Sequence, residues 1–119
     1  MPILGVGVDI IESERIRELC ERSPAFVDRV FTQVEQDYAM NKPSKYLHLA
    51  GRFAAKEAVA KALGTSFSWK EVEVVNESNG KPTINLYGRA KKAAKGAIVH
   101  ISISHTERYA TAFAILEEP

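Results

Sequence analysis

The sequence predicts an α+β fold, in which a mostly antiparallel sheet packs against one long helix and several short ones. Helical periodicity of apolar residues dominates the first half of the chain, up to residue 63. Runs of β-branched residues dominate the second half. The dipeptide Asn79-Gly80 between two such runs is typical of a tight hairpin, which joins antiparallel strands. Helices followed by strands indicate the α+β class.

The N-terminal part is predicted to hold one strand and one helix. Ile3–Asp9 is rich in β-branched residues and carries two glycines, at which another backbone can approach closely. Ser13–Arg22 has an apolar stripe at helical spacing, and Ser23-Pro24 ends that helix.

The middle of the chain is predicted to be helical. Apolar side chains over 26–31 share one face of a short segment. Thr32 begins another short helix, with Glu35 three residues later completing a capping box. The long helix is predicted over Pro43–Leu63, because proline suits a first turn and Gly64 suits the position past the end.

The C-terminal part is predicted to hold two strand pairs around a short helix. Val72–Val75 and Thr83–Tyr87 flank the hairpin turn. A basic helix follows over Gly88–Lys95 and ends at Gly96, and Ile98–Ser104 then pairs with Ala110–Leu116. We expect one domain over residues 1–119.

Length and composition bound the class of protein. A chain of 119 residues can bury one modest core but cannot form a deep cleft between two domains, so a large substrate would need a second subunit. Apolar residues at 45% and charged residues at 26% are typical of a globular chain. The single cysteine, Cys20, excludes an internal disulfide. Without a signal peptide or a long apolar run, we expect a cytoplasmic protein that does not span a membrane.

Charge is unevenly distributed, although the net charge is only +1. Eight acidic and four basic residues lie between Asp9 and Asp37, whereas six basic residues and one acid, Glu57, lie between Lys42 and Lys70. This asymmetry indicates an anionic ligand near the middle segment. A solvated helix face would give the same pattern, and charge alone favours that interpretation.

Two carboxylates have surroundings that suit a metal ion. Glu57 and Lys61 lie four residues apart on one ridge of the long helix, and Arg52 and Lys56 form the adjoining ridge. Mg²⁺ typically takes one or two carboxylates together with phosphate oxygens and water, and Asp9 with Glu57 would supply such a pair. The structural alternatives are a helix N-cap for Asp9 and a surface ion pair between Glu57 and Lys61.

A polar stripe lies on one predicted strand. His100, Ser102 and Ser104 share a face, and isoleucines occupy the other. His100 and His105 point to opposite faces, so we expect no shared zinc ion. Such a face lines a site or is partly solvated, and His105 at the strand end is within reach of a phosphate.

Four segments together resemble one family, the holo-acyl-carrier-protein synthases, which are the short type of 4′-phosphopantetheinyl transferase. They are Gly7-Val8-Asp9-Ile10 followed by Arg15, the segment from Arg52 to Ala62, the turn Asn79-Gly80-Lys81-Pro82, and the segment from His100 to His105. The resemblance covers nearly the whole chain in order and implies that family's fold. It also implies Mg²⁺-dependent transfer of the 4′-phosphopantetheine arm of coenzyme A to a serine of apo-acyl carrier protein, with release of adenosine 3′,5′-bisphosphate, in fatty acid biosynthesis.

The resemblance assigns roles to individual residues. Asp9 and Glu57 match the metal ligands, and Lys61 matches a lysine near the pyrophosphate. The residues expected to contact coenzyme A are Arg52, Lys56, Lys61, Gly64, Ser104, His105 and Thr106. The residues expected to serve catalysis are Glu57, Lys61, Glu35 and Asp37, and the last two and Glu57 are alternative acceptors of the serine proton. If Glu35 only completes the capping box, its replacement should cost stability but spare kcat.

The resemblance also implies partners. Arg15 matches a contact to the carrier protein, and we expect Arg15, Leu19 and Arg22 to form a ridge that receives an acidic helix of that carrier. A chain this short is expected to act as a homotrimer with coenzyme A sites at its interfaces. Larger relatives often carry a third carboxylate two residues after the first, where this chain has Ile11, so a water is expected there.

Two other classes of protein fit part of the sequence. A two-histidine phosphoesterase would use His100-Ile101-Ser102, but the second such motif is missing because His48-Leu49-Ala50 lacks the hydroxyl. A binding module for an anionic ligand or RNA would use the basic helix. This chain has no paired aromatic residues for base stacking, and its net charge is not strongly basic, so we expect no nucleic acid partner.

Overall fold

The computed structural model describes residues 2–119 and confirms the α+β class. In chain order the elements are β1 (Ile3–Glu12), α1 (Ser13–Arg22), α2 (Pro24–Val30), α3 (Gln33–Ala39), α4 (Lys45–Leu63), a 3₁₀ turn η1 (Trp69–Glu71), β2 (Val72–Asn76), β3 (Pro82–Leu86), α5 (Gly88–Ala94), β4 (Ile98–His105) and β5 (Tyr109–Glu117). No helix among the described residues is long and apolar enough to cross a membrane.

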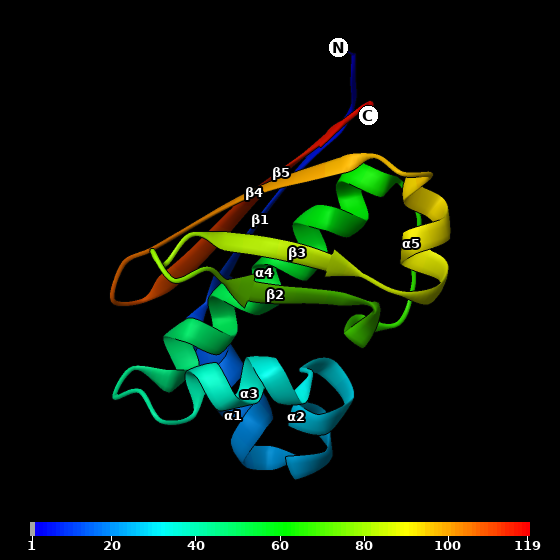
Figure 1. Cartoon of the computed structure of the whole chain (residues 1–119). Coiled ribbons are helices and arrows are strands. Elements are labelled where there is room, and N and C mark those ends of the chain that lie inside the picture. The colour runs from blue at the N-terminus through cyan, green and yellow to red at the C-terminus, as the bar shows by residue number, and fades with distance from the viewer. Residues whose placement is uncertain (1) are drawn as a thin grey trace.

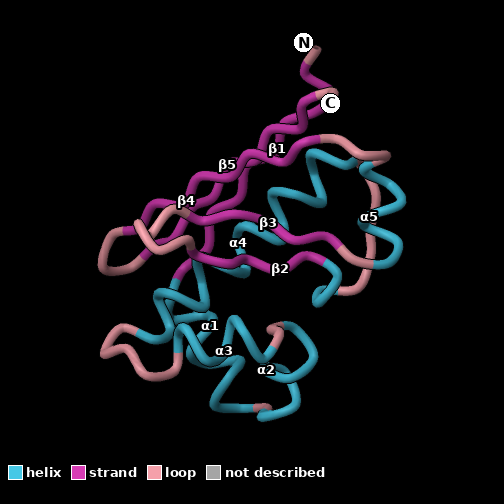
Figure 2. Tube along the Cα trace, in the orientation of Figure 1, coloured by secondary structure: helices cyan, strands magenta, loops and turns pink. Residues whose placement is uncertain are grey.

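The strands form two antiparallel sheets on either side of α4. One sheet has the order β1-β5-β4 and the other is the β2-β3 hairpin. Figure 1 shows α4 running between them, and it packs against β1, β5 and β2. The short helices α1, α2 and α3 gather at one end of the sheets (Figure 2). The long helix therefore connects every layer of the fold, and its ridges face different neighbours.

Two glycines bring β1 against the backbone of α4. A Cβ atom on Gly7 would lie 1.9 Å from the carbonyl oxygen of Ala58, and one on Gly5 would lie 2.1 Å from that of Ala62. Real atoms cannot approach so closely, so only glycine fits at these positions. The close backbone approach predicted from the two glycines is confirmed. It places Asp9, two residues after Gly7, beside the ridge of α4 that carries Glu57 and Lys61.

Most predicted boundaries agree with the structure, and α1 matches at both ends. The Thr32–Glu35 capping box is present. Gly64 ends α4 in the left-handed conformation with a φ of 73°. The predicted helix start at Pro43 is wrong by two residues, because the backbone N–H groups of Leu47 and His48 both donate to Ser44, which makes Ser44 the cap.

The first strand is longer than predicted. Ile10, Ile11 and Glu12 continue the ladder with Thr111, Ala110 and Tyr109 of β5. The longer strand carries Asp9 in its interior rather than at its end, so Asp9 is not a helix N-cap, and Glu12 holds that position instead.

The outer face of the three-stranded sheet is apolar and exposed. Alternation along β1 turns Val6, Val8 and Ile10 outward, where each is more than half exposed. Phe113 on β5 pairs with Val8 and is also exposed. Contiguous exposed apolar surface of this kind is typical of a protein–protein interface.

Candidate active site

Asp9, Glu57 and Lys61 form one group at the contact between β1 and α4. The Lys61 ammonium donates a hydrogen bond to the carbonyl oxygen of Val8 at 2.9 Å and lies 3.5 Å from the carboxylate of Asp9. The backbone of Asp9 is held from the other side by the hydroxyl of Thr111, which donates to the Asp9 carbonyl at 2.8 Å. The three side chains therefore lie at a rigid junction of a strand and a helix.

The carboxylates of Asp9 and Glu57 share a single neighbouring cation, Lys61. Burial raises the pKa of Asp9 and of Glu57 above their ordinary values, because excluded water no longer solvates the charge. The Asp9 charge raises the pKa of Glu57 further, whereas Lys61 lowers both. Two partly desolvated carboxylates with one cation beside Asp9 suit a hard divalent cation such as Mg²⁺. Among residues 2–119 no third metal-ligating side chain joins them.

The raised pKa values predict that this pair destabilises the folded chain at neutral pH when no metal is bound. At a pH above 4.5, which is its ordinary pKa, Glu57 ionises readily in the unfolded chain. In the folded chain its pKa is higher, so ionisation there costs free energy. We expect metal-free Glu57→Gln to melt above the parent chain at pH 7, and the difference to shrink as the pH falls toward 4.5. Circular dichroism melts in chelator at several pH values measure this, and a parent chain that is as stable as Glu57→Gln at pH 7 would contradict it.

A cavity of about 390 Å³ opens beside these carboxylates. Its lining residues are Asp9, Ile10, Ile11, Glu12, Arg15, Phe53, Glu57 and Tyr109. The structure thus brings Arg15 of α1 to the same cavity as Asp9 and Glu57. Sequence reasoning missed Glu12 and Tyr109, which pair with each other at the end of the β1–β5 ladder. Ile11 packs against both core clusters.

A second, cationic group lies near the N-terminal end of α4. The Arg52 guanidinium stacks on the Tyr38 ring at 4.1 Å, and Lys42 lies 4.5 Å from the same ring. The His48 ring meets Tyr38 edge-on at 5.8 Å and His105 at 6.0 Å. The structure brings Arg52 and His105 into one region, because Tyr38 and His48 lie between them. Sequence reasoning missed His48 and Tyr38 as members of this group.

Arg52 is oriented by a hydrogen bond to Asn76. Its guanidinium donates to the Asn76 side-chain oxygen, and the Asn76 amide donates to the carbonyl oxygen of Gly80 at 2.9 Å. Burial, with Arg52 and Lys42 nearby, lowers the pKa of His48. Cations held this close repel one another, so a bound anion would relieve the repulsion.

Lys56 and Glu35 do not belong to either group, which corrects two sequence predictions. Both side chains are 0% exposed and form an ion pair at 2.8 Å. Lys56 cannot contact coenzyme A, and Glu35 cannot reach a serine, because neither touches solvent. Burial lowers the pKa of Lys56, although the Glu35 charge opposes that shift. Glu35 completes the capping box, but this is not its only contact, because it also pairs with Lys56 and accepts from the backbone N–H of Val74.

The remaining predicted residues are dispersed. Asp37 is exposed on α3, where it accepts a hydrogen bond from Gln33, and it lines neither group. Gly64 is exposed at the end of α4, and Thr106 accepts hydrogen bonds that close the β4–β5 hairpin. Ser104 lies on the outer face of the sheet, exposed like His105.

The predicted ridge on α1 is only partly exposed. Arg15 and Arg22 face solvent, whereas Leu19 is half-buried and packs against the core under α1. The ridge is therefore two exposed cations on either side of a largely covered leucine.

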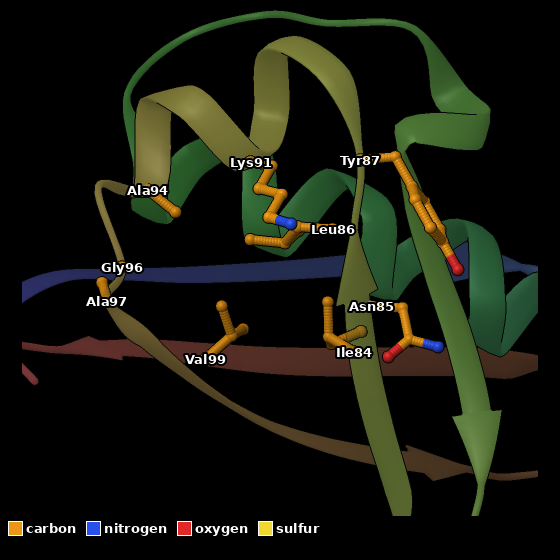
Figure 3. A pocket seen from close by; sticks show the side chains of 9 residues that line it. All are labelled: Ile84, Asn85, Leu86, Tyr87, Lys91, Ala94, Gly96, Ala97 and Val99. Carbon is orange, nitrogen blue, oxygen red and sulfur yellow. The ribbon is translucent and has the colours of Figure 1, made fainter.

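A larger cavity, of about 520 Å³, lies between β3, α5 and the start of β4 (Figure 3). Ile84, Leu86 and Val99 supply apolar walls and Lys91 of α5 supplies one cation. It contains no acid and no pair of cations, so size alone does not make it the better candidate for phosphate chemistry.

Comparison with known proteins gives a single family. Residues 5–114 match the model of the 4′-phosphopantetheinyl transferase superfamily. The holo-acyl-carrier-protein synthase of Protochlamydia amoebophila is 50% identical over 94% of this chain and 96% of its own length. The crystal structure of the Bacillus anthracis holo-acyl-carrier-protein synthase in complex with coenzyme A (3′,5′-ADP) is 36% identical, covers 98% of both chains and has a TM-score of 0.83. The Helicobacter pylori synthase in complex with coenzyme A has a TM-score of 0.84 at 26% identity, over 94% of this chain and 99% of its own.

Proposed function

Because the chain belongs to the holo-acyl-carrier-protein synthases of the 4′-phosphopantetheinyl transferase superfamily, we propose that the group formed by Asp9, Glu57 and Lys61 is where it transfers 4′-phosphopantetheine. The donor is coenzyme A and the acceptor is a serine of apo-acyl carrier protein. The observation that carries the site is the pair of partly buried carboxylates with one lysine at the β1–α4 junction.

Phosphoryl transfer depends on positioning and charge stabilisation more than on covalent chemistry by the protein. Asp9 and Glu57 would hold Mg²⁺, which supplies charge neutralisation at the pyrophosphate. The Lys61 ammonium, fixed by the Val8 carbonyl, would stabilise the charge on the leaving phosphate. The seryl oxygen attacks the β-phosphorus, and the bond to the bridging oxygen breaks to release adenosine 3′,5′-bisphosphate.

Glu57 is the best-placed acceptor for the seryl proton in the described chain. Glu35 is buried and Asp37 lies outside the cavity, whereas Glu57 lines the cavity. A general base must lie within hydrogen-bond reach of the proton that it accepts, directly or through one water. The proton would reach Glu57 directly or through one water.

The cationic group would bind the 3′-phosphate end of coenzyme A. It presents His48 and His105, with Lys42 close by, and adds the charge of Arg52, which is buried against Tyr38. His48 and Glu57 are nine residues apart on α4, which is about 13 Å along the helix axis. Coenzyme A carries phosphates at two separated points, so two anion sites are expected.

The apolar outer face of the three-stranded sheet would form the contacts of a homotrimer. Val6, Val8 and Phe113 would be buried against a neighbouring copy, which removes exposed apolar area from water. A site completed by the neighbour would also explain why the 390 Å³ cavity is open on one side of a chain this small. We propose a cytoplasmic location, which the single free cysteine, Cys20, fits. We also propose a role in fatty acid biosynthesis.

Arg15 would contact the acidic carrier protein, since it is exposed and lines the cavity beside Glu57. We expect Arg15→Glu to raise KM for the carrier about tenfold or more, because it replaces an attraction by a repulsion. The KM for coenzyme A should change much less. Steady-state kinetics with each substrate varied in turn measures both. Arg29→Glu on α2 serves as the charge-matched control, and a larger effect of Arg15→Glu on coenzyme A would contradict the assignment.

Intact-mass measurement of the carrier tests the function itself. The chain is incubated with apo-acyl carrier protein, coenzyme A and Mg²⁺, and the carrier should gain the mass of one phosphopantetheine. A competent carrier that gains no mass would overturn the proposed function.

A further inference from the structure

A buried ion pair lies next to Glu57 on α4, and the proposed chemistry does not use it. The ammonium of Lys56 lies 2.8 Å from the carboxylate of Glu35, and both side chains are 0% exposed. Desolvating two charges costs about as much as their attraction returns, so a buried pair contributes little net stability. Its presence in the small core of this chain therefore suggests a role other than stability.

Every polar atom of the pair is already bound to the protein. The two carboxylate oxygens of Glu35 accept hydrogen bonds from the backbone N–H groups of Thr32, at 2.9 Å, and Val74, at 2.8 Å. Lys56 also donates to the carbonyl oxygens of Trp69, at 3.1 Å, and Val72, at 2.5 Å. The pair connects α3, α4 and β2 at one point and has no free donor for a ligand.

The pair holds α4 from the side opposite to β1. Successive residues of an α-helix are about 100° apart, so Lys56 and Ala58 project from nearly opposite sides of α4. Ala58 is held against Gly7, where no Cβ would fit. Glu57 lies between these two contacts. Together they fix the rotation of the helix, and with it the direction in which Glu57 points.

The pair also fixes one wall beside Glu57. Trp69, whose carbonyl oxygen accepts from Lys56, stacks on Phe53 with ring centroids 4.8 Å apart. A cavity of about 170 Å³ lies between Trp69 and the helix, and Lys56, Glu57 and Phe67 line it too. If the Trp69 carbonyl moved, this wall would move relative to the carboxylate of Glu57.

We propose that Glu35 and Lys56 are positioning residues for phosphopantetheine transfer. They hold α4 on the side opposite to β1 and so orient Glu57 toward Asp9. The inference rests on the proposed function of Glu57. It assigns to Glu35 and Lys56 an effect on the rate of transfer and not on the binding of coenzyme A, since both side chains are 0% exposed and their charges are paired with each other.

The test is the double variant Glu35→Gln/Lys56→Met, which removes both charges and leaves no unpaired one. A small displacement of a catalytic group can cost about 10²-fold in rate, so we expect kcat to fall between about tenfold and 10²-fold. KM for coenzyme A and its affinity by calorimetry should stay within about twofold, because the binding residues are untouched. Rates are measured at a temperature at which circular dichroism shows the variant to be folded.

Leu49→Ala is the matched control, because it removes a buried side chain from the same helix without touching the pair. It should lower the melting temperature and keep kcat near that of the parent chain. Glu35→Asp keeps both charges but shortens the carboxylate, so it tests the same claim if the double variant fails to fold, and its kcat should also fall.

Two results overturn the inference. One is a folded double variant, or a folded Glu35→Asp, that keeps the kcat of the parent chain, and the other is a loss of kcat in Leu49→Ala as large as theirs. The parent chain in the same assay separates the two proposals. A parent chain that transfers nothing overturns the proposed function, whereas an active parent with unimpaired variants overturns only the positioning role.

Discussion

Glu57→Gln is expected to lower kcat by at least about 10²-fold, since loss of even an outer partner of a metal ligand costs 10- to 100-fold. The change keeps the shape of the side chain and removes its charge. Glu57 would both hold Mg²⁺ and accept the seryl proton, so the glutamine loses two roles at once. The measurement is the initial rate of adenosine 3′,5′-bisphosphate release at saturating Mg²⁺ and coenzyme A.

Glu118→Gln is the matched control for Glu57→Gln, because it removes an exposed carboxylate far along the chain from the site. It should leave the rate unchanged. Because the raised pKa of Glu57 predicts that its charge is destabilising without metal, Glu57→Gln should stay folded at the assay temperature. A folded Glu57→Gln with more than about a tenth of the parent rate would contradict the assignment of Glu57.

Phe113→Lys is expected to give an inactive monomer. Phe113 lies at the centre of the exposed apolar sheet face, paired with Val8 on one side and Ser102 on the other. A lysine there would have to be buried and unpaired in a trimer interface, which is strongly unfavourable. We expect analytical ultracentrifugation to show a trimer for the parent chain and a monomer for the variant. Transfer activity should fall by at least about 10²-fold with the missing subunit.

Val34→Lys provides the control for Phe113→Lys. Val34 is also about half exposed, at 50%, but lies on α3 and not on the sheet. It should remain a trimer and remain active. A monomeric Phe113→Lys that transfers at the parent rate would show that one chain holds the complete site.

Local sequence signals predicted the framework of the site well. The Gly-x-Gly spacing before Asp9 removes the Cβ atoms that would keep another backbone away, so a close approach at these positions could be predicted, although not that α4 makes it. The Thr32–Glu35 capping box and the Gly64 helix end depend on a few neighbouring residues and were also predicted.

Burial of charged side chains could not be predicted in the same way. Lys56 and Lys61 lie on one helix with similar neighbours in sequence, yet Lys56 is 0% exposed and Lys61 is exposed at 55%. The difference arises because β2 and α3, far along the chain in opposite directions, cover only the Lys56 side of α4. His48 was missed for a similar reason, since its neighbour His105 lies on the last hairpin.

The most direct test of the whole account is the mass of the carrier protein measured for the parent chain and Glu57→Gln side by side. With coenzyme A and Mg²⁺, the parent chain should convert apo-acyl carrier protein to a species heavier by one phosphopantetheine, with one adenosine 3′,5′-bisphosphate released per carrier. Chelation of Mg²⁺ or the Glu57→Gln change should each leave the carrier at its starting mass. A carrier that gains the same mass at the same rate with Glu57→Gln would contradict the account.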